Sequence, residues 1–259
     1  MILHELRLFF IALQFFTRLP VPRWVGYQPE WLHQSARHFP AVGALVGGVG
    51  AAVLWAAWWL FPMPVAVMLS MAATVLLTGA FHEDGLADTC DALGGVVSRE
   101  RALEIMKDSR IGTYGAVGLF LVLGLKALTL SALPLPWVLA ALVLAHTASR
   151  AAAVALIRWL PYAGDPAHAK AKPLAQRISG GGFAVAWGWV LVVGALLLTW
   201  NLAWWPAVLG GIVLALLCAA VSAAWLKHRL GGMTGDTLGA TQQLSELLVL
   251  LGCLAWLRF

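Results

Sequence analysis

Charged residues are scarce in this 259-residue chain. Only 11% of its residues are Asp, Glu, Lys or Arg and 61% are apolar, whereas a soluble domain is about 25% charged. A nucleic-acid-binding domain and a disordered tail both need more charge than this. Cysteine is scarce as well, and the three thiols lack metal-binding or redox spacing, which excludes a disulfide scaffold. The composition indicates a membrane protein, and its 14 tryptophans suit lipid–water boundaries.

Two long stretches have no charged residue at all. They run from His38 to His82 and from Ile178 to Leu226, and each is long enough for two crossings at about 20 residues per span. Breaking the apolar runs at Pro, Gly and charge predicts about seven transmembrane helices, over residues 40–61, 64–82, 111–131, 137–158, 183–200, 206–226 and 237–257. We therefore expect an all-α, polytopic integral membrane helix bundle forming one domain over residues 1–259.

The first 37 residues do not resemble a cleaved signal peptide. The apolar run Leu8–Phe16 follows the acidic residue Glu5, and no small-residue cleavage site comes after it. We expect residues 1–37 to be retained as a cytoplasmic or interfacial segment with a short amphipathic helix. A second short amphipathic helix is expected in the charged segment 83–110.

The loops between the predicted spans alternate between short, uncharged connectors and longer, charged ones. One side of the membrane consequently carries Arg18, Arg23, Arg37, Arg99, Arg101, Lys107, Arg110, Lys170, Lys172, Arg177, Lys227 and Arg229. The opposite side has little beyond Arg258. By the positive-inside rule, the charged loops are cytoplasmic.

Acidic residues cluster in the segment 83–110. They are Glu83, Asp84, Asp88, Asp91, Glu100, Glu104 and Asp108. If the second span continues as a helix, Asp84, Asp88 and Asp91 share one face at its C-terminal end, where the helix dipole disfavours negative charge. Such a cluster favours a hard divalent cation, Mg²⁺ or Mn²⁺, over zinc. The alternative is a solvated acidic loop or pairing with nearby Arg and Lys, which is the preferred interpretation for Glu100 and Glu104.

Basic residues and glycines follow the acids. Lys107 and Arg110 suit a phosphate, because a guanidinium offers a planar fork to its oxygens. Gly112 and Gly115 would let the backbone approach the same anion at a helix N-terminus. The alternative is that the two cations only set the membrane topology. The basic loop at residues 170–182 suits an anionic substrate or lipid headgroups equally.

The last predicted span opens with Asp236, which either belongs to a polar cavity or caps the helix. Gln243 and Glu246 follow on nearly the same face, and an ionisable group that deep in the bilayer must face the bundle interior. Arg150 lies near the cytoplasmic end of its span and is a candidate to bind substrate from a cavity there. The same reasoning places Lys126 of the third span toward the interior, with outward snorkelling as the alternative.

A core role is the preferred interpretation for the remaining intramembrane polar residue, His146. Together, a metal-binding acid cluster beside Arg and Lys predicts chemistry on a phosphoanhydride. No P-loop, dinucleotide fingerprint or catalytic triad competes. An ion-coupled transporter is a second alternative, although the acids gather at one membrane face and no inverted repeat is visible.

Three ordered motifs resemble the cobalamin synthase (adenosylcobinamide-GDP ribazoletransferase) family. They are HEDGLADTCDALGG at 82–95, MKDSRIGTYG at 106–115 and GDTLGA at 235–240, and FFTRLP at 15–20 resembles the family's opening. Asp84 also begins an Asp-Gly-x-x-Ala element reminiscent of CDP-alcohol phosphotransferases of phospholipid synthesis. That match is partial, because Asp88 stands where those enzymes have Arg.

The resemblance implies a multi-pass enzyme of the prokaryotic inner membrane that needs Mg²⁺. It would transfer the phosphocobinamide group of adenosylcobinamide-GDP to α-ribazole or its 5′-phosphate, giving adenosylcobalamin or its 5′-phosphate and GMP in vitamin B12 synthesis. The resemblance is compatible with association with other enzymes of the corrinoid pathway, and it implies no nucleic-acid partner.

Combining the residues with the resemblance predicts individual roles. The expected metal ligands are Asp84, Asp88 and Asp91, with Glu83 and Asp108 as further candidates. The expected catalytic residues are Asp91 as the preferred base, Asp88 and Arg110. The expected substrate-binding residues are Lys107, Arg110, Gly112, Asp236 and Arg150.

Overall fold

The computed structural model describes residues 2–164 and 175–257, which form helices and one isolated bridge between Tyr162 and Met233. The longer helices are α1 (Ile2–Phe16), α3 (Phe39–Trp58), α4 (Met63–Thr78), α5 (Phe81–Leu93), α7 (Thr113–Ala132), α8 (Leu135–Trp159), α10 (Gly180–Trp200), α11 (Trp205–Leu230) and α12 (Gly235–Trp256). The short ones are η1 (Arg23–Val25), α2 (Pro29–Ser35), η2 (Ala36–His38), α6 (Arg99–Ile105) and η3 (Leu202–Trp204). The all-α prediction is confirmed.

Six helical stretches of the described residues are long and apolar enough to cross a membrane. They are α3 with the α2–η2 segment before it, α7, α8, α10, α11 and α12. The bent pair α4–α5 raises this number to seven if it counts as one span. The expected polytopic bundle is therefore confirmed, and α1 and α6 lie where short amphipathic helices were predicted.

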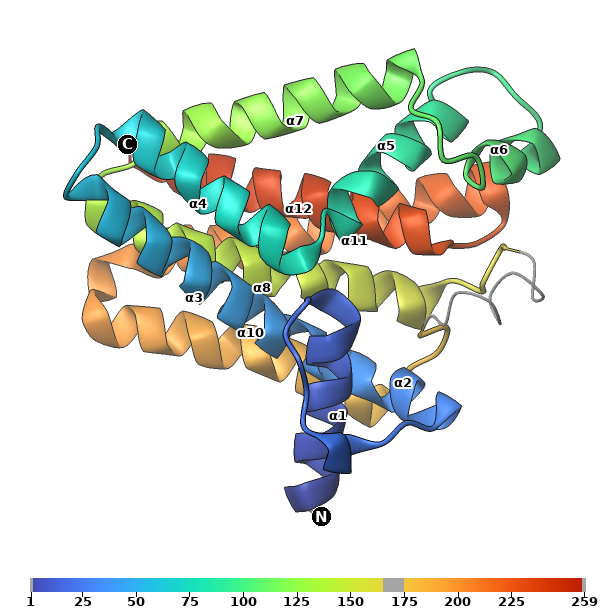
Figure 1. Cartoon of the computed structure of the whole chain (residues 1–259), viewed down its shortest axis with the longest axis horizontal. Coiled ribbons are helices and arrows are strands. Elements are labelled where there is room, and N and C mark those ends of the chain that lie inside the picture. The colour runs from blue at the N-terminus through green and yellow to red at the C-terminus, as the bar shows by residue number, and fades with distance from the viewer. Residues whose placement is uncertain (1, 165–174, 258–259) are drawn as a thin grey trace.

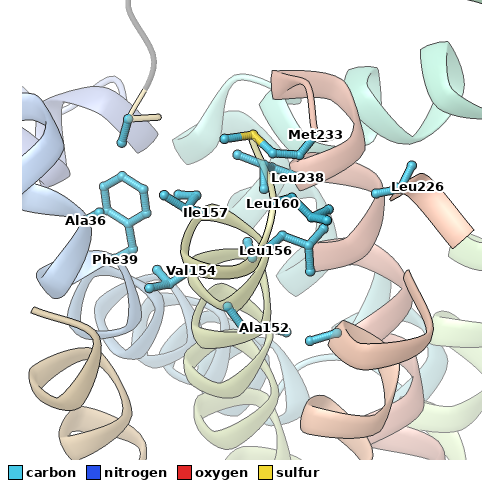
Figure 2. Packing of buried hydrophobic residues seen from close by; sticks show 14 of the residues in the cluster. Ala36, Phe39, Ala152, Val154, Leu156, Ile157, Leu160, Leu226, Met233 and Leu238 are labelled. Carbon is cyan, nitrogen blue, oxygen red and sulfur yellow. The ribbon is translucent and has the colours of Figure 1, made fainter. Parts of the chain in front are cut away.

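Helix α8 is the central element of the bundle (Figure 1). In an apolar 18-residue stretch of α8, 94% of the residues are buried, as expected for a helix surrounded by others. Figure 2 shows side chains of its last turns, Val154, Leu156 and Ile157, between Phe39 of α3 on one side and Leu226 of α11 on the other. Helices α3, α10, α11 and α12 pack directly against α8.

Helices α3 and α8 approach closely because α3 presents glycines to its partner. A Cβ atom on Gly43 would overlap the backbone oxygen of His146, and one on Gly47 would overlap that of Leu142. Small residues allow this approach in membranes, where helices associate through close packing and interhelical hydrogen bonds. Gly48 of the same helix faces open space.

The charged and uncharged connectors lie at opposite ends of the bundle (Figure 1). The α3–α4, α7–α8 and α10–α11 connections and the described C-terminal end lie at one end, and α6 with the loop before α12 lies at the other. The sidedness inferred from loop length and basic residues thus agrees with the fold. Lys170, Lys172 and Arg258 lie outside the described residues.

The second predicted span, 64–82, does not continue as one helix into the acidic segment. Gly79 (φ 71°) and Ala80 (φ 59°) both adopt the left-handed conformation, and α5 turns away from α4 by 89°. Glu83 and Asp84 therefore lie in the first turn of a new helix. The expectation of a helix C-terminus is therefore wrong for Asp84, which the dipole of α5 stabilises, whereas Asp91 does lie in the last turn of α5.

The N-terminal helix α1 runs across the direction of the long helices (Figure 1). Its Glu5 accepts hydrogen bonds from Arg37 at 3.1 Å and from His38 Nε2 at 2.9 Å. At its other end, Phe15 and Phe16 pack against Phe39 of α3. These contacts attach the N-terminal segment to the bundle.

We predict that Gly43→Ala lowers the stability of the detergent-purified protein, because the added methyl group must push α3 away from α8. Overpacking of this kind typically costs about 1–3 kcal/mol. Gly48→Ala is the matched control on the same helix and should melt like the wild type. Equal melting temperatures for the two variants in a thermal unfolding experiment would contradict the close packing described above.

Candidate functional site

The acidic helix α5 packs against α12 and α7 at the charged end of the bundle (Figure 1). The approach to α12 is close: a Cβ atom on Gly85 would lie 2.8 Å from the backbone oxygen of Asp236. Gly239 of α12 contacts the backbone of His82 and of Gly85 in return. The first turns of α5 and α12 therefore lie side by side, which brings the acidic motif next to Asp236.

Three carboxylates occupy the first two turns of α5. Glu83 is half-buried and its Oε1 accepts a hydrogen bond from Gln243 Nε2 of α12 at 3.1 Å, while its buried Oε2 has no hydrogen-bond partner. Asp84 is exposed and Asp88, one turn further along, is half-buried. The spacing of Asp84 and Asp88 places both on one side of the helix.

Asp91 has a different environment from the other acids of α5. Its two carboxylate oxygens accept backbone N–H groups at the start of α7, from Gly112 at 2.7 Å and from Gly115 at 2.8 Å. A Cβ atom at either glycine would overlap the Asp91 carboxylate. From the sequence, these glycines were expected to let a phosphate approach the backbone. In the structure they make room for the Asp91 side chain, so the anion at the α7 N-terminus is the Asp91 carboxylate.

Arg110 and Asp108 form an exposed ion pair in the loop before α7. Arg110 Nη2 lies 2.6 Å from Asp108 Oδ2 and its Nε lies 2.9 Å from Oδ1. Hydrogen bonds from the Arg110 side chain and backbone lower the pKa of Asp108 to about 2. Asp108 is therefore ionised at any working pH, and a phosphate that binds Arg110 must compete with it. Lys107 is exposed nearby.

Asp236 is not the N-cap of α12. Thr234 caps the helix: its hydroxyl accepts the backbone N–H of Thr237 at 3.2 Å, and the Thr237 hydroxyl accepts that of Thr234 at 2.8 Å. The capping alternative for Asp236 is therefore wrong. Its side chain is half-buried in the first turn, beside α5.

Two arginines at the charged end stabilise the loops around the site, a role that sequence reasoning missed. Arg99 donates to the backbone oxygens of Leu230 at 2.7 Å and Ala163 at 3.2 Å, and Arg229 donates to that of Gly95 at 3.2 Å. The Leu230 oxygen lies at the C-terminus of α11, where a cation is favourable. The only sequence signal was an excess of Arg in the loops.

Other surface charges pair locally. Arg101 contacts Glu104 at 2.9 Å, which confirms surface pairing for that acid, and Arg177 of the basic loop contacts Glu30 of α2 at 2.6 Å.

A buried polar cluster lies beneath the acidic helix. Glu246 of α12 forms an ion pair with Lys126 of α7, and its Oε2 lies 3.0 Å from Nδ1 of His146 of α8. Arg150 donates to the backbone oxygen of His146 at 3.0 Å. Glu246 faces the interior as predicted, and Lys126 does too, since its carboxylate partner is buried within the bundle; the snorkelling alternative is wrong.

A pocket opens beside this cluster, between α1, α3, α5, α8 and α12. It is lined by Phe15, Phe16, Phe39, Phe81, His82, Arg150, Ala153, Ile157, Gly235, Leu238, Gly239 and Gln242. Arg150, the candidate from the fourth span, therefore does reach a cavity. Two lining residues, His82 and Gly235, directly precede the acids Glu83 and Asp236.

The carboxylates do not form a preassembled metal cage. In residues 2–164 and 175–257, no three His, Cys, Asp or Glu side chains gather closely enough to hold an ion. Mg²⁺, however, usually binds through one or two carboxylates together with substrate phosphates. The unpartnered Oε2 of Glu83 and the adjacent Asp84 and Asp88 suit that mode of binding.

A polytopic helix bundle with a carboxylate-rich helix and basic loops at one end has the organisation of an integral membrane transferase. A family described as cobalamin-5-phosphate synthase matches residues 8–254, and this chain belongs to it. No solved structure matches the chain.

Curated relatives are similar over their whole length. A protein of Leptothrix cholodnii named adenosylcobinamide-GDP ribazoletransferase is 61% identical, covering 100% of this chain and 98% of its own. Proteins of the same name from Shewanella amazonensis (48% identical, 95% and 94% covered) and Vibrio cholerae (46%, 98% and 96%) follow. The family resemblance expected from the motifs is confirmed.

We predict that Gly115→Ala displaces Asp91 from the α7 N-terminus, because the new methyl group occupies the position of the carboxylate. The loss of its two hydrogen bonds and the overpacking should together destabilise the purified protein by about 2–4 kcal/mol. Gly124→Ala, on the same helix but facing open space, should leave the melting temperature unchanged. Indistinguishable melting curves would show that Asp91 does not depend on this glycine.

Proposed function

We propose that this chain is an adenosylcobinamide-GDP ribazoletransferase. It would transfer the phosphocobinamide group of adenosylcobinamide-GDP to α-ribazole or α-ribazole 5′-phosphate, with release of GMP. The observation that carries the proposal is the 61% identity to a relative of that name across the full chain. The acidic helix α5 beside Asp236 supports the proposal, because a pyrophosphate substrate needs carboxylates that can hold a divalent cation on its oxygens.

The proposed reaction forms a phosphodiester and breaks a phosphoanhydride. A ribose hydroxyl of α-ribazole attacks the phosphorus on the cobinamide side. The bond from that phosphorus to the bridging oxygen breaks, and GMP leaves with the bridging oxygen. We propose that Glu83, Asp84 and Asp88 hold Mg²⁺, with Mn²⁺ as an alternative ion. When bound, the ion would neutralise charge on the pyrophosphate oxygens and on the leaving group.

The protein's own residues would position the reactants. Arg110 and Lys107 would bind the phosphate of the leaving GMP, with Arg110 exchanging Asp108 for a substrate oxygen. Asp88 is a better candidate than Asp91 for the base, because both oxygens of Asp91 already accept backbone N–H groups. Asp91 would then act as a positioning residue that holds the loop containing Gly112 against α5.

The proposed site faces the cytoplasm of the prokaryotic inner membrane. The basic residues at the charged end of the bundle support this orientation by the positive-inside rule. Association with other enzymes of the corrinoid pathway stays a prediction. A CDP-alcohol phosphotransferase and an ion-coupled transporter are not favoured by the comparisons, and the buried charges that suggested transport pair with one another.

The first test is GMP release by the detergent-purified protein from adenosylcobinamide-GDP and α-ribazole. We expect release that is matched by a cobalamin product and abolished by excess EDTA. Absence of release from folded protein with verified substrates would refute the proposed function.

We further predict that Asp88→Asn lowers the turnover number about 100-fold or more at saturating Mg²⁺, because the neutral amide removes a charge that the transition state needs. Glu104→Gln is the control, since Glu104 only pairs with exposed Arg101. Turnover of Asp88→Asn within a few-fold of the wild type would remove Asp88 from the site.

A further inference from the structure

Two neighbouring glutamines of α12 donate every amide hydrogen that they have. Gln243 Nε2 donates to Glu83 Oε1 and to Gln242 Oε1, each at 3.1 Å. Gln242 Nε2 donates to Ser149 at 2.9 Å and to Glu246 at 2.6 Å. Gln243 is only 3% exposed, so water does not compete for its amide. The donor capacity of Gln243 is thus fully used, and half of it goes to a carboxylate of the acidic helix.

The first turn of α5 leaves the Glu83 side chain available to α12. Glu83 is the third residue after the N-cap Ala80, and an acid at that position often accepts the backbone N–H of the N-cap residue. Here the Ala80 N–H donates instead to the backbone oxygen of Val75 in α4, at 3.0 Å. The Glu83 carboxylate reaches across to α12 and accepts from Gln243.

Each of these two bonded side chains keeps one buried oxygen that has no hydrogen-bond partner in the part of the chain that the structure describes. The two atoms are Oε2 of Glu83 and Oε1 of Gln243. An ionised carboxylate and an amide oxygen only accept, and a buried acceptor without a donor is costly. A cation satisfies a carboxylate oxygen directly, and Mg²⁺ keeps several waters that can donate to an amide oxygen. The unpartnered oxygens therefore suit a hydrated divalent cation.

The environment of Glu83 differs from that of two other acids near the site. Asp91 has both of its oxygens engaged by backbone N–H groups, and Asp108 is paired with Arg110. Gln243 occupies only one oxygen of Glu83. Because its amide is neutral, it orients the carboxylate without cancelling the negative charge that a cation needs.

We propose that Gln243 is a positioning residue for the divalent cation, which holds Oε1 of Glu83 and so leaves Oε2 for the ion. This inference rests on the proposed function, in which Glu83 is a metal ligand. Residues that orient a metal ligand through a hydrogen bond typically change metal affinity by about 10–100-fold when they are replaced.

The test measures how tightly the detergent-purified protein binds the complex of Mn²⁺ with GDP, by electron paramagnetic resonance. Gln243→Met removes both donated hydrogen bonds and keeps an unbranched, adaptable side chain. We expect it to raise the dissociation constant of Mn²⁺–GDP about tenfold or more. The dissociation constant of GDP without metal, measured by calorimetry, should not change, because Gln243 acts on the ion.

Gln242→Met is the matched control. It also removes two donated hydrogen bonds from the buried cluster, but it leaves the bond between Gln243 and Glu83 in place. Its dissociation constant for Mn²⁺–GDP should stay within about twofold of the wild type. A loss as large as that in Gln243→Met would show a general effect of the cluster and overturn the inference.

A double-mutant cycle tests whether Gln243 acts through Glu83. Glu83→Gln removes the charge of the ligand at a half-buried position and should weaken Mn²⁺–GDP binding at least as much as Gln243→Met. In the Glu83→Gln background, Gln243→Met should then add less than about twofold. Additive losses would overturn the inference. So would unchanged binding in Glu83→Gln, which decides the matter even if Gln243→Met does not fold.

Metal binding and turnover together separate failure of this inference from failure of the proposed function. A coupled loss of Mn²⁺–GDP binding, in a protein whose wild type releases no GMP, would refute the reaction and keep the role of Gln243. Cation-dependent GMP release by the wild type, with unchanged Mn²⁺–GDP affinity in Gln243→Met, would refute the inference alone. No binding of Mn²⁺–GDP by folded wild type would overturn the metal site and this inference with it.

Discussion

Two consecutive residues with positive φ, Gly79 and Ala80, end α4 and start α5, and the geometry of the site follows from the turn that they impose. A left-handed conformation is uncommon for alanine, so the surrounding packing must hold it. Arg18 does part of this, since its backbone N–H donates to Leu77 and its guanidinium lies against Gly79. Because α5 departs by 89°, its acids leave the direction of the spanning helices and reach the first turn of α12.

The sequence was sufficient for the spans and for the acidic motif, because apolar length and charge spacing are local properties. It was insufficient for the break at Gly79, since the apolar run continues to His82 without a proline or a charge. The partner of Asp91 was also out of reach, because the contact with Gly115 depends on how α7 docks on α5. The sequence could not decide between the two alternatives for Lys126 for the same reason: no sequence pattern gives the rotation of one spanning helix against another.

The buried polar cluster connects the site to the middle of the bundle. Glu83 is hydrogen-bonded to Gln243, which donates to Gln242, which in turn donates to Glu246. Glu246 pairs with Lys126 of α7, so one chain of contacts joins three helices. A buried ionic group of this kind contributes little net stability, and its best-attested use is to fix register. Here it would fix the rotation of α12, on which the placement of Asp236 depends.

The pair formed by Lys126 and Glu246 also sets an order of events during synthesis. Lys126 enters the bilayer with α7, and an uncompensated lysine inside a spanning helix costs about 3 kcal/mol on the insertion scale. Its carboxylate partner emerges from the ribosome only with α12, the last helix of the described residues. The bundle consequently closes last around α12. A nascent chain that stops before α12 lacks both Glu246, which neutralises Lys126, and Asp236 of the site.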